Sequence, residues 1–290
     1  MRRRHPANLN RLLVNKEVNP PAFLRSLAKY SLVKYNTAIE MPAKMMKPIP
    51  AKVIHGYLAA MKTIGLIGGL TWHSTIDYYR HINQLVQQRL GAQHSARLLL
   101  HSVDFEEIRQ RTFANDWAAI AAHMTAVARQ LEQAGAHCLL LGANTMHHIA
   151  DEVQAHIDIP LLHIADATAK AIAAQGLQTV ALLGTRYTMQ LPFYHQRLAA
   201  HGIQAMVPSA NDQQVVHDAI YNEMASGIFA DATRQQYNAI IATLQQQGAQ
   251  GVIMGCTEIP LLLRPAELSL PLFDTARLHA EAAVQFALGE

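Results

Sequence analysis

A weak internal repeat limits the folds that this chain can adopt. The segment Leu131–Ala143 (LEQAGAHCLLLGA) recurs 113 residues later as Leu244–Cys256 (LQQQGAQGVIMGC). Each copy has the pattern of a helix end, a turn, a short apolar strand and a loop. A second pair of similar segments, Lys62–Gly68 and Gln178–Gly184, are apolar runs of strand length that end in glycine. The chain after residue 60 therefore consists of two similar halves.

The pattern within each half is that of an α/β protein. Continuous apolar strands that alternate with helical patterns indicate βαβ units and a parallel sheet covered on both faces. We predict two similar doubly wound parallel-sheet domains, residues 61–160 and 161–275, and a C-terminal helix, residues 276–290, that packs on the first domain. Gly135 and Gly248 stand where helix C-caps belong. Helices are expected at residues 75–88, 117–134, 166–174, 234–247 and 275–288.

The repeat also predicts where a ligand binds. In open parallel sheets, ligands bind beyond the carboxyl ends of the strands. Four loops fall at such ends: residues 68–71, 143–145, 185–188 and 256–258. Two facing halves would therefore form one active-site cleft between the domains.

The first sixty residues differ from the rest in composition. They hold six of the twelve prolines, one of the fifteen glycines, and a net charge of +9 from 11 Lys/Arg and 2 Asp/Glu. This segment is Arg-rich and acid-poor like a targeting peptide, or it is a disordered tail, or it is no part of the working protein. The abrupt change to a strand and glycine turn after Met61 favours the last interpretation, with Met61 as the start.

The composition of the remaining chain limits its partners. Residues 61–290 carry a net charge of −6, and an acidic body without a basic patch is a poor binder of nucleic acid. No stretch approaches the ~20 apolar residues of a membrane span, so we predict no membrane partner. Two cysteines in 290 residues make no disulfide framework, which indicates a reducing compartment and a cytoplasmic location.

Cys256 is the strongest candidate for a reactive group. It follows the apolar strand GVIM and precedes a possible helix start at Thr257. Backbone N–H groups at such a position favour the thiolate, so we expect a pKa below the free value of ~8.5. A thiolate there can serve as a nucleophile or a base, although a buried structural cysteine remains the alternative. Cys138 lies in the middle of a strand and is expected to be structural.

The matching loop of the first half contains Asn144 and Thr145. Their amide, hydroxyl and backbone N–H groups suit a carboxylate ligand, and plain N-capping of the next helix is the alternative. His147 and His148 follow, but no ligand set in the chain has metal spacing, so we predict no metal site. The glycines at positions 65, 68 and 69 do not have the Gly-x-Gly-x-x-Gly spacing of a dinucleotide-binding loop.

Six short motifs give the chain a family resemblance when they are taken in order. They are Gly68–Thr75, His101–Phe105, Asn144–His147, His163–Asp166, Gly184–Thr188 and Gly255–Glu258. Each motif alone is weak, but their order and spacing together are specific. From Met61 to the C-terminus the sequence resembles the aspartate/glutamate racemase family, and within it the bacterial broad-specificity amino-acid racemase branch.

This resemblance implies a fold and a mechanism. Family members have two α/β domains related by a pseudo-twofold axis, and they use no cofactor. Two cysteines, one per domain, face each other across the α-carbon of the amino-acid substrate; one thiolate removes the α-proton and the other thiol protonates the opposite face. Cys256 takes the second-domain position. The resemblance also implies a homodimer, an expectation that is only carried over from the family.

The chain departs from the family at the first cysteine. The position that holds Cys or Thr in the family is Ala143, and a methyl group neither accepts nor donates a proton. Thr145, His147 or a water molecule are the neighbouring alternatives for the missing partner. The substrate carboxylate is expected at Asn144, Thr145 and Thr257.

The residues that bind the side chain of the substrate are predicted less strongly. The candidates are Thr71, Arg111 and Thr112. The leading hypothesis is a pyridoxal-phosphate-independent amino-acid racemase, an isomerase in which Ala143 impairs inversion. A one-cysteine isomerase or decarboxylase of the same superfamily, or a non-catalytic amino-acid-binding protein, are the alternatives.

Overall fold

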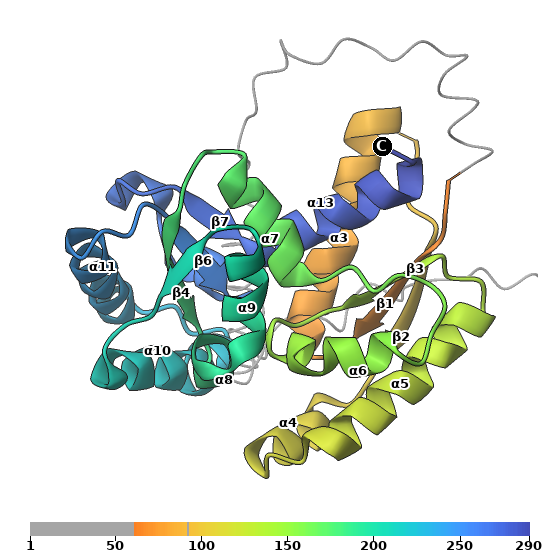
Figure 1. Cartoon of the computed structure of the whole chain (residues 1–290), viewed down its shortest axis with the longest axis horizontal. Helices are drawn as coiled ribbons and strands as arrows, with labels where there is room; N and C mark the ends of the chain where they lie inside the picture. Colours follow the sequence, from red (N-terminus) through yellow and green to blue (C-terminus); the bar gives the residue numbers. More distant parts are fainter. Residues whose placement is uncertain (1–60, 92) are drawn as a thin grey trace, which may run out of the picture. The chain divides into compact units, whose positions relative to one another are not determined.

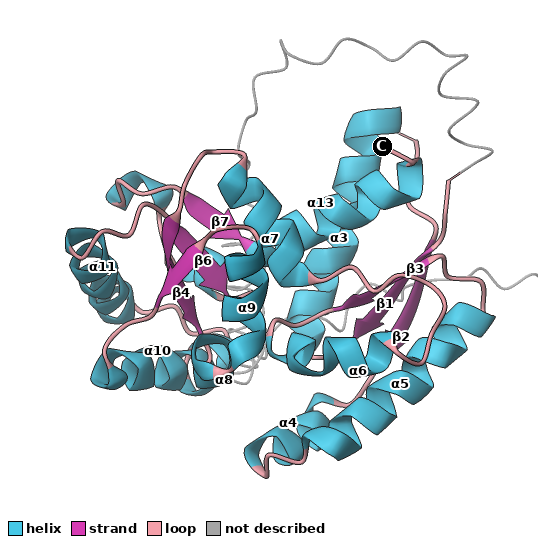
Figure 2. Ribbon diagram, viewed as in Figure 1, coloured by secondary structure: helices cyan, strands magenta, loops and turns pink. Residues whose placement is uncertain are grey.

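The computed structural model describes residues 61–91 and 93–290. The expectations for the first sixty residues lie outside this part of the chain. The described residues form two α/β halves, each built around a parallel sheet (Figure 1 and Figure 2). The predicted fold class is therefore confirmed.

The first half contains a parallel sheet with strand order β2-β1-β3. Alternate side chains of a strand point to opposite faces of the sheet. Ile64 and Leu66 of the central strand accordingly pack with α3 and α13 (Thr275–Leu288), whereas Ile67 packs with α5. The elements of this half are β1 (Ile64–Gly68), α3 (Trp72–Leu90), β2 (Leu98–Ser102), α4 (Phe105–Phe113), α5 (Trp117–Gln133), β3 (Cys138–Leu141), η2 (Thr145–Ile149) and α6 (Ala150–Gln154).

The second half contains a parallel sheet with strand order β5-β4-β6-β7. Leu183 and Met254 pack with α10 and α11 on one face, and Leu182 and Ile253 pack with α7 and α9 on the other. The elements are α7 (Ile164–Ala173), β4 (Thr179–Gly184), α8 (Arg186–Gln190), α9 (Pro192–Ala200), β5 (Gln204–Met206), α10 (Ala210–Asn222), η3 (Met224–Ser226), α11 (Asp231–Gln246), β6 (Val252–Gly255), α12 (Ile259–Leu262), η4 (Pro265–Glu267) and β7 (Leu272–Asp274).

Helix α13 connects the two halves. It begins at Thr275, directly after β7 of the second sheet, and it packs against α3 of the first half and α7 of the second (Figure 1). Tyr78 Oη of α3 lies 2.8 Å from His279 Nδ1, and the Lys62 N–H donates to the Ala287 carbonyl. Alanines on the buried face of α13 allow this close approach of helices.

Both halves need a glycine at the end of the repeated strand, because the neighbouring strand leaves no room for a Cβ atom. A Cβ atom on Gly142 would lie 2.9 Å from the Ile67 carbonyl oxygen, and one on Gly255 would lie 2.8 Å from the Leu183 carbonyl oxygen. Each strand therefore ends so close to its neighbour that only glycine fits. Gly135 and Gly248 have φ of +96° and +109° and stand one residue beyond the C-caps Ala134 and Gln247, so each glycine ends its helix one position later than predicted.

Most helix boundaries expected from the sequence are correct within three residues. Helix α13 has the predicted bounds, whereas α3 begins three residues early because Thr71 caps it. Within the described residues, six further α-helices lie outside the five expected ranges: α4, α6, α8, α9, α10 and α12. Helix α4 is capped by Asp104 and α10 by Ser209, and both caps are sequence signals of the usual kind.

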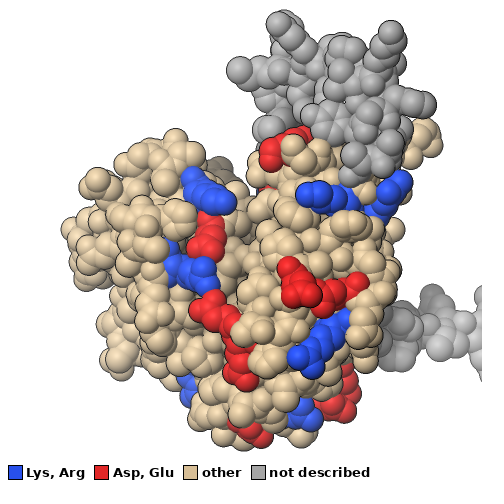
Figure 3. Space-filling model, turned by 45° about the vertical axis from the view of Figure 1, so that its right-hand side comes forward, with Lys and Arg blue, Asp and Glu red and all other residues tan. Residues whose placement is uncertain are grey.

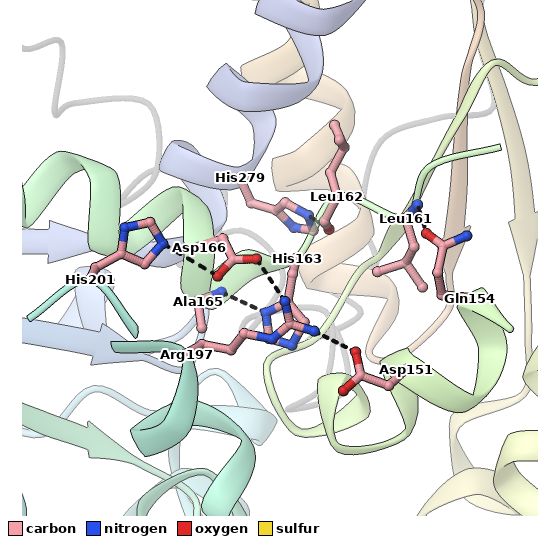
Figure 4. A network of polar contacts seen from close by, with 10 residues as sticks. All are labelled: Asp151, Gln154, Leu161, Leu162, His163, Ala165, Asp166, Arg197, His201 and His279. Atoms are coloured by element: carbon pink, nitrogen blue, oxygen red, sulfur yellow. Dashed lines mark hydrogen bonds and ion pairs between the residues drawn. The ribbon is translucent and has the colours of Figure 1, made fainter. Parts of the chain in front are cut away.

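An arginine joins elements of both halves. The Arg197 guanidinium on α9 pairs with Asp151 on α6 and with Asp166 on α7, at 3.2 Å from the latter (Figure 4). His201 Nε2 lies 3.6 Å from the same Asp166 carboxylate. The side chains are partly exposed, so this cluster, which links the first turn of α6 to α7 and α9, adds only modestly to stability.

The described surface carries few charges, and they are mixed in sign. On the face drawn in Figure 3, acidic and basic side chains lie next to each other and most of the surface is uncharged. None of the described helices is long and apolar enough to cross a lipid bilayer. The expectations on nucleic acid and on a homodimer stay predictions.

Candidate active site

The strand-end loops of both halves line one pocket. Seven predicted residues are among its lining: Thr71, Thr112, Ala143, Asn144, Thr145, Cys256 and Thr257. The pocket is therefore located where the repeat predicted it, beyond the carboxyl ends of the central strands. The sequence located the loops that contain Thr185 and Glu258 at ligand-binding strand ends but gave neither residue a role, and it missed the lining residues Arg109 and Tyr221.

The Cys256 thiol is paired with a carboxylate. It follows β6 and donates a hydrogen bond to Glu258 Oε2 at 2.9 Å. Burial and the adjacent Glu258 charge raise the pKa of the thiol well above its usual value, against the opposing effect of the backbone N–H groups of residues 257 and 258. The predicted lowering of the Cys256 pKa is therefore wrong, because burial and the carboxylate outweigh the N–H groups.

Glu258 is held by hydroxyl groups from both halves. Its Oε2 accepts a hydrogen bond from Thr257 Oγ1 at 2.7 Å, and its Oε1 accepts one from Thr71 Oγ1 at 3.4 Å. The residue is buried, with 5% of its surface exposed. Glu258 Oε2 lies within hydrogen-bond distance of the Cys256 thiol, where a proton can pass between the two groups. A Glu two residues after a Cys in a turn was the available sequence signal.

The backbone at Thr71 is strained. Its φ is +78°, a conformation that is rare for a β-branched residue. The same residue is the N-cap of α3, and its hydroxyl accepts a hydrogen bond from the Ser74 N–H at 3.3 Å. In this backbone conformation the Thr71 hydroxyl contacts both the Ser74 N–H and Glu258 Oε1.

Asn144 lines the pocket and holds one buried, unpaired acceptor. Thr275 Oγ1 donates to the Met254 carbonyl at 3.0 Å, so this hydroxyl accepts from Asn144 Nδ2, also at 3.0 Å. The pairing fixes the amide orientation. Asn144 Oδ1 is then a buried oxygen without a hydrogen-bond partner, and such a group costs free energy unless a ligand satisfies it.

Threonines of both halves meet at the pocket. Thr145 Oγ1 lies 3.0 Å from Thr185 Oγ1 and 3.4 Å from Thr188 Oγ1. Thr145 follows β3 and Thr185 follows β4, so the two sheet ends contribute one hydroxyl each. Each hydroxyl can donate to its neighbour or to a bound anion.

The His147 side chain does not reach the pocket. Its Nδ1 donates to the Ala143 carbonyl at 2.9 Å, and its ring packs against His163 and His279 with centroid separations of 4.7 and 5.3 Å. Burial and these two neighbours lower its pKa well below the usual value. The suggestion that His147 replaces the missing thiol is therefore wrong, because the ring turns into the core.

Arg111 is also absent from the pocket, and Arg109 lines it instead. Both lie on α4, where residues two positions apart point in nearly opposite directions. The prediction of Arg111 failed because this segment was not recognised as a helix. Thr112 does line the pocket, but its hydroxyl donates to the Ile108 carbonyl at 2.8 Å.

Comparisons with known proteins identify the family of this chain. Residues 67–283 match the family model described as Asp/Glu/Hydantoin racemase. A broad-specificity amino-acid racemase from Bacillus subtilis is 26% identical over 227 residues, which cover 76% of this chain and 96% of that protein.

Solved structures have the same fold. A provisionally named Asp/Glu racemase from Yersinia pestis is 48% identical with a TM-score of 0.75, covering 79% of this chain and 100% of its own. An aspartate racemase homologue from Pyrococcus horikoshii is 32% identical with a TM-score of 0.70, covering 78% and 99%. With a family match that spans most of the chain and a pocket at its paired strand ends, this protein belongs to the Asp/Glu/Hydantoin racemase family.

Proposed function

We propose that this protein removes and returns the α-hydrogen of amino acids, with Cys256 as the working acid–base group and Glu258 as its proton acceptor. The observation that carries the proposal is the hydrogen bond of 2.9 Å from the Cys256 thiol to the buried Glu258 carboxylate in the pocket. Family membership supports an isomerase of the amino-acid racemase type.

The polar groups of the pocket suit the backbone of an amino acid. The hydroxyls of Thr145 and Thr185 would donate to the α-carboxylate, with Thr257 beside them. The unpaired Asn144 Oδ1 would accept from the α-ammonium group. A bound ammonium group would also favour the Cys256 thiolate, since a nearby positive charge lowers a thiol pKa.

The proton transfers follow from these groups. Glu258 takes the thiol proton and becomes a carboxylic acid. The Cys256 thiolate then takes the α-proton of the enantiomer whose Cα–H faces it, which leaves a carbanion and the neutral thiol. Return of a proton from the same thiol regenerates the same enantiomer. Because Glu258 and the thiol exchange protons with solvent, deuterium enters with retention.

Inversion needs a proton donor on the other face of the α-carbon. The repeat relates Ala143 to Cys256, and Ala143 has no such proton. Thr145 or a water molecule beside Ala143 would have to supply it, and both are far weaker acids than a thiol. We therefore expect hydrogen exchange to exceed inversion.

The test of this proposal is α-deuterium exchange followed by proton NMR. L- and D-amino acids are incubated with enzyme in D2O, and loss of the α-proton signal is timed. Cys256→Ser should abolish exchange because a hydroxyl is not ionised near neutral pH. Cys138→Ser, which changes the other thiol, is the matched control. Full exchange by Cys256→Ser would exclude Cys256 as the base.

The absence of a second thiol favours a second candidate function, a reaction that needs only one thiol. A single thiol suffices for a reaction that delivers one proton, such as a decarboxylation, or for addition to an alkene in cis–trans isomerisation. Product analysis with aspartate, an arylmalonate and maleate distinguishes the reactions. Turnover of arylmalonate or maleate without exchange on amino acids would favour this candidate.

A further inference from the structure

The pocket has a polar end and an apolar end. Cys256, Asn144 and the threonine hydroxyls are polar, whereas the rest of the lining is largely hydrocarbon. The apolar wall consists of Leu70, Phe105, Met146, Ile220, Tyr221 and Ala225. If the α-carbon lies at Cys256, as in the proposed function, the side chain of the substrate faces this wall.

Arg109 is the only cation that the described residues contribute to the pocket lining. Its Nε and Nη2 both donate to Glu106, at 2.7 Å to each carboxylate oxygen. Its guanidinium lies over the Phe113 ring, 5.0 Å from the centroid. Such a two-bond pair is the strongest arrangement of these groups, so the guanidinium is already matched to a carboxylate.

The partner of Arg109 remains charged at neutral pH. Hydrogen bonds from Arg109 and Gln110 lower the pKa of Glu106 to about 2. The Arg109–Glu106 pair is therefore neutral overall. A carboxylate on the substrate side chain would have to compete with Glu106 for the guanidinium and would lose hydration against the apolar wall.

We infer that the side-chain subsite of this pocket selects amino acids with uncharged, apolar side chains over aspartate and glutamate, and that Glu106 sets this selectivity by neutralising Arg109. The inference rests on the proposed function for the position of the α-carbon. An unbranched aliphatic side chain would bury its apolar surface beside Leu70 and Ile220, which stabilises the complex.

The pair makes Glu106 a specificity-determining residue without contact to the α-carbon. Removal of its charge frees the guanidinium for a substrate carboxylate. Glu107 is a matched control because it is the next residue on α4, is exposed and ionisable, and has no hydrogen bond or ion pair with Arg109 among the described contacts.

Isothermal titration calorimetry with L-norleucine and L-aspartate tests the inference on the wild type, Glu106→Gln and Glu107→Gln. The wild type should bind norleucine at least about tenfold more tightly than aspartate. Glu106→Gln should raise the aspartate affinity relative to that of norleucine about fivefold, as expected for one partly exposed ion pair. Glu107→Gln should keep the wild-type ratio.

Three results would overturn the inference: a wild type that prefers aspartate, a wild type that binds neither ligand, or an equal change of the ratio in both variants. The binding ratio and the α-deuterium exchange are measured in separate experiments, so the inference and the proposed function fail separately. The predicted binding ratios without any α-deuterium exchange would leave the selectivity in place and exclude the acid–base role of Cys256.

Discussion

At the scale of single residues, the site is determined by which hydrogen bonds are already made. Glu258 accepts a hydrogen bond from the Cys256 thiol, and Glu106 accepts hydrogen bonds from Arg109. Asn144 has one oxygen without a hydrogen-bond partner. The sequence predicted the positions of Cys256 and Asn144 from the repeat. It could not predict the raised thiol pKa, because burial and the orientation of a carboxylate depend on side chains from both halves.

Glu258→Gln should separate thiol acidity from proton transfer. Loss of the carboxylate removes a negative charge and an acceptor, so the pKa of Cys256 should fall and alkylation by iodoacetamide should begin at lower pH. Exchange of the α-hydrogen should nevertheless slow by about 10²–10⁴-fold, since the base for the thiol proton is gone.

Mass spectrometry of the alkylated peptides measures this prediction, with Cys138 as the internal control. Burial raises the pKa of Cys138 to about 12, so its labelling should stay slow in both proteins. Faster exchange together with earlier alkylation of Cys256 would mean that Glu258 only suppresses the thiolate and takes no part in proton transfer.

At the scale of elements, the strand ends position the site and α3 stores strain at its start. The sequence predicted the strands and the glycines that end the helices because Gly135 and Gly248 need left-handed backbone. It did not predict α4, since its first and last turns contain charged residues and its apolar period is short. The choice between Arg109 and Arg111 depended on that helix.

Thr71→Gly should be more stable than Thr71→Ala by more than the ordinary preference of an N-cap for glycine over alanine. Thr71→Ala loses the cap hydroxyl and keeps φ at +78°, so it should lose about 1 kcal/mol in the free energy of unfolding. Thr71→Gly also loses the hydroxyl, but it relieves backbone strain of roughly 1–3 kcal/mol. It should be at least as stable as the wild type.

Urea denaturation of the three proteins gives the comparison. Ser74→Ala, which keeps the Thr71 backbone and its cap acceptor, serves as the control for loss of a hydroxyl in the same turn. Equal midpoints for Thr71→Ala and Thr71→Gly would show that the backbone at residue 71 is relaxed.

At the scale of the whole molecule, buried histidines join the two halves. His147 follows the first sheet, His163 caps α7 and His279 lies on α13. Burial lowers the pKa of His163 to about 3, with a further contribution from Arg197, and that of His279 to about 4. All three rings are therefore neutral in the folded protein at neutral pH.

This cluster should make the protein sensitive to acid. Unfolded histidines titrate near ~6.5, above the pKa values in the folded state, so the unfolded state binds more protons between that pH and about 4. Stability should be complete above this window and fall as the pH decreases through it, by up to about 1.4 kcal/mol per histidine and pH unit.

His163→Asn should reduce this loss by about one third, because an asparagine keeps the cap to the Ala165 N–H without titrating. Melting temperatures of wild type and variant across the window measure the effect. His156→Asn, at an exposed position, is the control. A wild-type midpoint that stays constant through the window would contradict the neutral cluster.

The central claim is that Cys256 acts alone, with no proton donor at Ala143. The most direct measurement compares deuterium exchange with inversion for each enantiomer, by proton NMR and chiral chromatography of the same samples. The wild type should exchange one enantiomer with retention and invert it slowly, and Ala143→Cys should raise inversion more than exchange. Inversion of both enantiomers by the wild type as fast as exchange would contradict the claim.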